Sequence, residues 1–177
     1  MTKIIGLPDK LADDYILLLG KIESNNNPNA KAKTSTASGR FQFIKSTWEG
    51  LGYNWKDVLN DKLQHEAALK FTNNNAKGLQ NAGCAVNFAT LYGAHFLGLK
   101  GFLKIMAASP STPITKVTTS AARKANPTIL KGNVSDFTDW LKKKTGHDYR
   151  DRFVVQTELP KQRMTLWDLI KQLFNWR

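Results

Sequence analysis

The sequence contains one cysteine and three histidines, and this scarcity excludes several kinds of site. Cys84 has no second cysteine with which to form an internal disulfide, and its apolar neighbours suggest a small buried hydrophobic residue. His65, His95 and His147 are scattered, and neither H-x-x-x-H nor C-x-x-C spacing occurs. The G-x-S-x-G motif and a phosphate-cradling glycine loop are also missing. We therefore expect no metal ion and no cofactor, and we set aside metallohydrolase, catalytic-triad and nucleotide-hydrolase chemistry.

Long hydrophobic segments are likewise missing from the 177 residues. No stretch approaches the roughly 20 apolar residues that span a bilayer. The N-terminus lacks the charged region, apolar run and small-residue cleavage site of a secretory signal peptide. We therefore expect a protein that is made in the cytoplasm without a signal peptide and that needs another route if it acts outside. The length fits one domain, or one domain with a short tail.

Basic residues are abundant and unevenly distributed, and the net charge is +12. Residues 1–90 carry 11 Lys and Arg against 8 acids, and residues 91–177 carry 15 against 6. The two halves therefore have net charges of +3 and +9. Such a charge favours polyanionic partners, namely nucleic acid, anionic lipid headgroups or acidic cell-wall polymers, and by itself does not choose among them.

Apolar residues recur mostly at helical spacing, which predicts an all-α protein. Asparagine and proline stop the first predicted helix, and an asparagine run stops the third. Ser135 is the predicted N-cap, and Gly146 the predicted C-terminal end, of a later helix. A short run at residues 153–155 is the one possible strand. The predicted helices cover residues 10–23, from about 45, from 61 to the asparagine run at 73–75, 82–97, 99–106, 114–125, 135–146 and 165–177.

The helical periodicity is lost after Gly146, and we divide the chain there. Residues 1–146 form the predicted helical domain, and residues 147–177 form a charged linker followed by a basic amphipathic helix. Thr165, three residues before Asp168, resembles a capping box at the start of that helix. The helix either packs on the domain or lies on an anionic membrane surface. The side chains that would contact a membrane are Lys161, Arg163, Trp167, Lys171, Trp176 and Arg177.

The segment from Lys21 to Trp48 holds the strongest candidate for chemistry. Glu23 falls at the end of the first predicted helix, on the edge of its apolar stripe. A polar loop follows and returns through Gly39, a glycine that marks a left-handed turn or a close backbone approach, to an aromatic stretch. This order places an acid at the rim of a cleft, where burial raises the pKa of a carboxyl as a general acid near neutral pH requires. The alternative interpretation is a solvated glutamate in the last turn of a helix.

The stretch E-S-N-N-N-P-N-A, followed by A-K-T-S-T-A-S-G-R-F-Q-F-I-K-S-T-W, resembles the soluble lytic transglycosylase and goose-type lysozyme-like group, which includes phage and prophage endolysins. Members share a Glu-Ser pair and then a glycine-bearing segment that ends in Gln before an apolar residue. A second block, A-T-L-Y-G-A-H-F-L-G at residues 89–98, resembles the tyrosine-bearing helix of the group. Two departures occur: T-A at residues 36–37 replaces Gly-Ala or Ser-Ala, and G-A-H replaces Asn-x-Gly after the tyrosine. The likeness covers roughly residues 11–131.

The resemblance implies a lysozyme-like fold and cleavage of the β-1,4 bond between N-acetylmuramic acid and N-acetylglucosamine in peptidoglycan. It assigns Glu23 as the catalytic general acid and base. Tyr92 would hydrogen-bond that carboxyl, and polar side chains of the loop would bind acetamido or backbone groups of the sugar. The plainer alternatives are a core aromatic for Tyr92 and structural roles for the loop side chains. The residues assigned to substrate binding or orientation are Ser24, Ser35, Gln42, Phe43 and Tyr92.

A single carboxylate suffices if an N-acetyl or 6-hydroxyl group of the sugar completes the displacement. A two-carboxylate enzyme needs a partner about 5–9.5 Å away. No acid occurs between Glu23 and Glu49, which favours a lytic transglycosylase over a hydrolytic muramidase, and Glu49, Asp57 or Glu66 would be the partner if the fold brought one close.

The resemblance also implies a setting for the activity. We expect a monomeric, bacteriolytic endolysin that binds no nucleic acid. Its partners are peptidoglycan and, through the C-terminal helix, the anionic outer-membrane surface. It is made in the host cytoplasm and acts on periplasmic peptidoglycan after release. The alternative from another class is a non-catalytic basic module that binds cell-wall polymer or nucleic acid.

Overall fold

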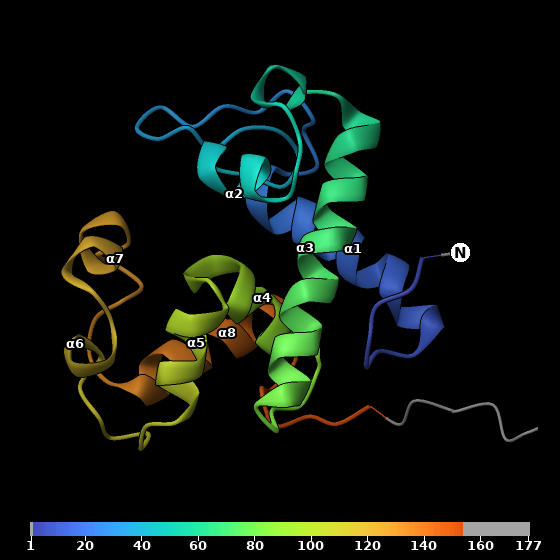
Figure 1. The fold of residues 1–177 in the computed structure, drawn as a ribbon. Helices are drawn as coiled ribbons and strands as arrows, with labels where there is room; N and C mark the ends of the chain where they lie inside the picture. Colours follow the sequence, from blue (N-terminus) through green and yellow to red (C-terminus); the bar gives the residue numbers. More distant parts are fainter. Residues whose placement is uncertain (1, 154–177) are drawn as a thin grey trace, which may run out of the picture.

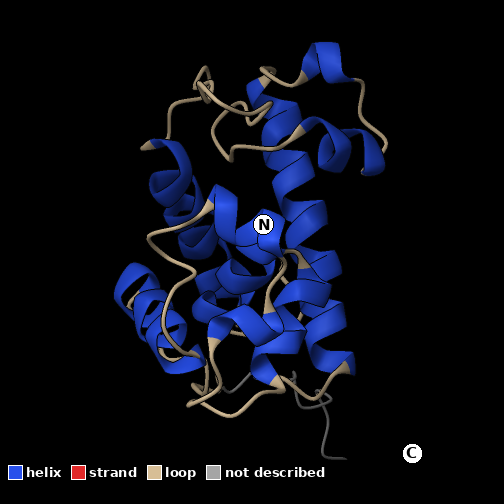
Figure 2. Cartoon of the chain, turned by 90° about the vertical axis from the view of Figure 1, so that its left-hand side faces the viewer, coloured by secondary structure: helices blue, strands red, loops and turns tan. Residues whose placement is uncertain are grey.

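The computed structural model describes residues 2–153, and this part of the chain is mostly helical (Figure 1). Within it there are no β-strands, and extended pairing is limited to isolated bridges (Figure 2). The predicted all-α class is therefore confirmed for these residues. The elements are α1 (Asp9–Ser24), α2 (Lys45–Gly50), the 3-10 helix η1 (Trp55–Asp57), α3 (Asp61–Asn81), α4 (Phe88–Leu97), α5 (Leu99–Met106), α6 (Ile114–Val117), α7 (Ser120–Ala125) and α8 (Val134–Thr145).

Helix α4 forms the centre of the packing. Every residue from Phe88 to Ala94 is buried, as expected of a helix that is hydrophobic on all sides. It packs against α3, α5 and α8. The 21-residue helix α3 extends beyond this bundle, and the long loop with α2 lies at its N-terminal end (Figure 1). Helices α6 and α7 lie to the left of α5 in the same view.

Helix α1 matches the predicted first helix and carries the candidate acid near its end. Its buried side includes Tyr15 and Leu19. It ends at Ser24 because Asn25 and Asn26 adopt positive φ angles of 54° and 60°, in the left-handed region that asparagine tolerates better than most residues. The predicted stop at the asparagines is therefore confirmed here.

The second asparagine run does not stop α3, so that prediction was wrong. The helix continues through Asn73 and Asn75 to Asn81. The Asn73 amide donates to the Lys3 carbonyl at 3.0 Å and accepts from the Ile5 amide at 2.9 Å, while Asn75 is buried. Asparagine costs a helix less than about 0.7 kcal/mol relative to alanine, so these tertiary contacts decide the outcome.

Two other predicted boundaries were also wrong. Helix α4 begins at Phe88 rather than at residue 82, because Asn87 forms a capping box with Thr90. The helix predicted over 114–125 is divided into α6 and α7, because the Thr119 side chain accepts a hydrogen bond from the Ala122 amide and starts a new helix.

The N-cap of the last described helix, α8, lies two residues earlier than predicted. Asn133 and Asp136 form a capping box at its N-terminus, so Ser135 lies inside the helix and is not the cap. Gly146 ends it with a φ of 75°, as predicted.

The segment that follows α8 wraps back onto the domain as far as it is described. The Asn87 amide, which is fully buried, donates to the backbone carbonyls of Asp148, Tyr149 and Asp151 at 2.8–3.1 Å. The ring of Phe88 lies 4.6 Å from that of His147, centroid to centroid. The predicted strand continues past residue 153 and the predicted basic helix lies wholly past it, so both fall outside the described residues. Among residues 2–153, no helix is long and apolar enough to cross a membrane.

Candidate active site

Glu23 lies in the last turn of α1 and is largely withdrawn from solvent. Its side chain is 18% exposed, and its Oε1 lies 3.7 Å from the His95 Nε2. The His95 ring, on α4, is only 10% exposed. Tyr92 precedes His95 by one turn of α4 and donates a hydrogen bond to the Glu23 carboxyl. Helices α1 and α4 therefore bring Glu23 against two titratable side chains, Tyr92 and His95, that are far from it in the sequence.

The environment of Glu23 favours its protonated form. Burial raises the pKa of this carboxyl from 4.5 to about 7, although the Tyr92 hydrogen bond and the charge of Lys144 act in the opposite direction. Burial and the neighbouring carboxyl in turn raise the pKa of Tyr92, which keeps the phenol protonated as a donor. A carboxyl with a pKa near 7 is partly protonated at neutral pH, and can both give and take a proton there.

His95 is kept uncharged by the same desolvation. Burial lowers its pKa to about 4, despite a hydrogen bond to the backbone carbonyl of Phe41. The rings of Phe71 and Phe43 pack edge-on against it, with centroids 5.6 and 6.2 Å away. A charged imidazolium at this position would stabilise the Glu23 carboxylate and lower its pKa. Because the ring is neutral, it does not lower the pKa of Glu23 in this way.

A cleft of about 400 Å³ opens in front of Glu23. Its wall combines the carboxyl, the imidazole of His95, the amide of Gln42 and apolar side chains, of which Ile44 is exposed. Among the described residues, Glu23 is the one carboxylate in this wall. The lining residues are Glu23, Gln42, Phe43, Ile44, Thr47, Phe71, His95, Phe96, Leu97 and Gly98.

The loop that forms one wall is held by Arg40. Its guanidinium makes a bidentate contact with Asp61 at 2.9–3.1 Å and donates to the Asn26 carbonyl at 2.8 Å. The Arg40 amide donates to the side chain of Gln64, which is fully buried and reaches the Pro28 carbonyl. These contacts anchor the loop to the first turn of α3, and thus set the positions of the residues that follow Arg40.

Gly39 is required beside this anchor. Its φ is 78°, and a Cβ atom there would lie 2.6 Å from the Gln64 Oε1. Both predicted uses of this glycine, a left-handed turn and a close approach, therefore apply. Gln42 also has a positive φ of 50° and donates its side-chain amide to the Gly39 carbonyl at 2.8 Å.

The structure brings some of the predicted site residues together and leaves others apart. Glu23, Gln42 and Phe43 line the cleft, and Tyr92 lies behind it against the carboxyl. Ser24 is not part of the lining; its hydroxyl donates to the Arg40 carbonyl at 2.7 Å and so joins the end of α1 to the loop.

Ser35 is exposed and also lies outside the cleft lining. Its hydroxyl accepts a hydrogen bond from the Ala37 amide at 3.2 Å. This contact is local to the tip of the loop and stabilises a turn there. The structure thus gives Ser24 and Ser35 contacts within the protein rather than contacts in the cleft.

His95 and Arg40 were missed as site residues by reasoning from the sequence. The histidines were considered only as metal ligands, although His95 lies three residues after Tyr92 and therefore on the same side of a helix. Arg40 holds the loop through its ion pair with Asp61, which is 21 residues away. No local sequence pattern predicts that ion pair.

The other candidate carboxylates are not part of the cleft wall. Glu49 lies 3.8 Å from Lys45, and Glu66 lies 4.0 Å from Lys62; both are exposed ion pairs on helix surfaces. Asp57 lies in η1 and is also absent from the lining.

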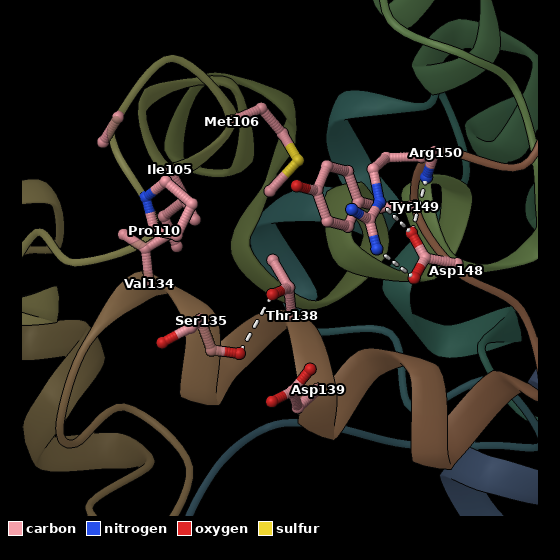
Figure 3. Close-up of a pocket in the computed structure, with 11 residues that line it drawn as sticks. Ile105, Met106, Pro110, Val134, Ser135, Thr138, Asp139, Asp148, Tyr149 and Arg150 are labelled. Carbon is pink, nitrogen blue, oxygen red and sulfur yellow. Dashed lines mark hydrogen bonds and ion pairs between the residues drawn. The ribbon is translucent and has the colours of Figure 1, made fainter.

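A second cavity, of about 210 Å³, lies between α5, α8 and the segment after α8 (Figure 3). Its Asp148 carboxylate is fully engaged by the Arg150 guanidinium at 2.8–2.9 Å and by Lys142 at 3.4 Å, and these contacts hold the pKa of Asp148 well below its usual range. The carboxylate of this cavity therefore forms a structural ion pair, whereas the carboxyl of the Glu23 cleft has a raised pKa.

Within residues 2–153, no group of three or more His, Cys, Asp or Glu side chains is arranged to hold a metal ion. Comparisons with protein-family models and with curated proteins found no match to this sequence.

Proposed function

We propose that this protein is a peptidoglycan-degrading glycosidase that cleaves the β-1,4 bond between N-acetylmuramic acid and N-acetylglucosamine, with Glu23 as the general acid and base. The observation that carries the proposal is the buried Glu23 carboxyl on the wall of a cleft, with its pKa raised to about 7. The sequence resemblance to lytic transglycosylases and goose-type lysozymes supplies the substrate class.

In the proposed reaction, protonated Glu23 donates its proton to the glycosidic oxygen as the bond from that oxygen to the anomeric carbon breaks. Positive charge then develops on the anomeric carbon and the ring oxygen. The resulting carboxylate is stabilised by the Tyr92 hydroxyl, and takes a proton from the oxygen nucleophile that attacks the anomeric carbon. Glu23 ends the cycle protonated, so one carboxyl serves both steps.

We favour the 6-hydroxyl of the muramic acid residue as that nucleophile, which makes the enzyme a lytic transglycosylase with a 1,6-anhydro product. A hydrolysing pair of carboxylates requires a second acid about 5–9.5 Å from the first. The described part of the cleft wall offers Glu23 alone, with neutral His95 as its neighbour. Attack by water, as in a muramidase, is the alternative outcome of the same site.

The proposed setting is bacterial lysis by a phage or prophage endolysin that reaches periplasmic peptidoglycan after release from the host cytoplasm. A net charge of +12 suits an acidic wall polymer as the substrate.

The test is the Glu23→Gln variant, which keeps the side-chain shape and removes the proton. The wild type should clear a suspension of chloroform-treated Gram-negative cells, and the variant should not. Cell lysis that survives the substitution, or a wild type that binds purified wall without cleaving it, would contradict the proposal. Mass spectrometry of the released muropeptides separates the two chemistries, because an anhydro end indicates transglycosylation and a reducing end indicates hydrolysis.

A further inference from the structure

A third cavity, of about 460 Å³, lies between α5, α6 and α7. Lys100 and Lys104 are one helical turn apart on α5, and Lys116 faces the same space from α6. Figure 1 shows α6 and α7 beside α5, on the side away from α1. The remaining lining is mixed: Leu97, Gly101, Val117, Thr118, Thr119 and Ala122.

Among the described residues, the lining of this lysine-lined cavity contains no Asp or Glu. Between Glu66 and Asp136 the sequence has eight Lys and Arg and no Asp or Glu. Among the ion pairs of the described residues, none involves Lys100, Lys104 or Lys116. Three ammonium groups around one space repel one another, and an anionic ligand would relieve that repulsion.

This cavity neighbours the Glu23 cleft, and the two spaces share one lining residue. Leu97, at the end of α4, lines both spaces, and Gly98 and Leu99 then lead directly into α5. A ligand that extends from the cleft past Leu97 would therefore come close to the three lysines. A polymer with an uncharged backbone and acidic branches would place neutral groups at Glu23 and negative groups at the lysines.

Resting on the proposed function, we propose that the lysine-lined cavity binds the free carboxylates of the stem peptides that branch from the peptidoglycan strand being cleaved. The apolar side chains of Leu97, Val117 and Ala122 suit the alkyl parts of such a peptide. The charged groups are lysines, which act as point charges on flexible stems, whereas arginine is the residue that offers bidentate geometry to phosphate. The cavity would thus select stem-bearing, carboxylate-rich glycan over bare glycan.

The experiment compares the wild type with the triple variant Lys100→Gln, Lys104→Gln and Lys116→Gln. The control is a second triple variant, Lys10→Gln, Lys56→Gln and Lys77→Gln, which changes three exposed lysines outside this cavity. Both variants lower the net charge equally. The substrates are intact peptidoglycan, the same material with its stem carboxylates amidated, and glycan from which an amidase has removed the stems.

The cavity variant should cleave intact peptidoglycan about tenfold more slowly than the control variant at low substrate, since each solvent-exposed pair contributes a modest amount. The two variants should cleave amidated and stem-free material at equal rates. Thermal unfolding of both variants checks that the fold is retained.

Equal rates of the two variants on intact peptidoglycan would overturn this inference and leave the proposed function standing. An equal loss by the cavity variant on all three substrates would also overturn it. A short DNA duplex that competes with cleavage in the wild type and the control, but not in the cavity variant, would assign the cavity to phosphate instead. A wild type that cleaves none of the glycans would refute the proposed function itself.

Discussion

Replacing Glu23 with Gln should stabilise the protein at alkaline pH. Burial raises the pKa of this carboxyl from 4.5 to about 7. The folded protein therefore binds a proton that the unfolded chain has released between these two values, and stability falls as the pH rises through them. At about 1.36 kcal/mol per pH unit, the cost of ionising Glu23 in the fold reaches about 3 kcal/mol above pH 7.

Glutamine removes this cost because it does not ionise. Its carbonyl oxygen can accept the Tyr92 hydrogen bond, and its amide can face the His95 Nε2 that lies 3.7 Å from the carboxyl in the wild type. The variant should therefore be more stable than the wild type by up to about 3 kcal/mol at pH 8, and about equal to it at pH 4. For a chain of this size the difference at pH 8 corresponds to roughly 6–12 °C in melting temperature.

The assay is thermal unfolding followed by circular dichroism at a series of pH values from 4 to 8. The difference between the two proteins isolates Glu23, because every other group titrates in both. The control is Glu49→Gln, which removes an exposed carboxylate paired with Lys45 and should change stability by less than about 1 kcal/mol. A Glu23→Gln variant that is less stable at pH 8, or whose difference from the wild type does not vary with pH, would refute the reasoning.

Three further predictions follow from the same geometry. Cleavage should decline above about pH 7 as Glu23 loses its proton. The Tyr92→Phe variant should shift this alkaline limb of the pH–rate profile to higher pH, because it removes a hydrogen-bond donor to the carboxylate. A limb at the same pH as in the wild type would contradict the assigned hydrogen bond. The pKa of His95 lies near 4 in the fold, against 6.5 ordinarily, so its contribution to stability is fully present above pH 6.5 and is lost as the pH falls towards 4. The His95→Asn variant should lack this loss of stability at acid pH when its unfolding is measured. A loss equal to that of the wild type would contradict the prediction. Gly39→Ala should lower the free energy of unfolding in urea by more than about 1 kcal/mol, because φ is positive there and a Cβ atom would lie 2.6 Å from a buried glutamine. The control Gly50→Ala, with open space around it, should be nearly neutral. Equal losses of stability in the two variants would argue against the described loop.

The proposed activity and the stability of the fold make opposite demands on Glu23. A carboxyl that stayed in water would ionise near 4.5 and would seldom carry a proton at neutral pH. Burial between α1 and α4 raises the pKa of the carboxyl, and as a result the fold is less stable above pH 7. The neutral His95 fits the same arrangement. A hydrophobic residue at position 95 would deprive Glu23 of a polar neighbour, and a positively charged one would lower the pKa of the Glu23 carboxyl.

Local signals in the sequence were sufficient where a single residue decides the backbone. The asparagines after Ser24 end α1, Gly39 takes its left-handed turn and Gly146 ends α8, because each choice rests on steric freedom at that position. Glu23 differs from these cases, because its place on the edge of an apolar stripe left a solvated glutamate as the alternative, and the family resemblance made it the candidate acid.

Tertiary structure decided other features, because their contacts join distant residues. Asn73 stays helical through bonds to residues 3 and 5, and Asn87 holds the chain after α8. The starts of α4, α7 and α8 were missed for a different reason, since local caps at Asn87, Thr119 and Asn133 set them.

The candidate acid also depends on distant residues: the sequence alone indicates a carboxyl at a helix end, with a solvated glutamate as the alternative. Its pKa is raised because packing in the fold excludes water from the carboxyl, and the same packing brings Tyr92 and His95, about 70 residues away, against it.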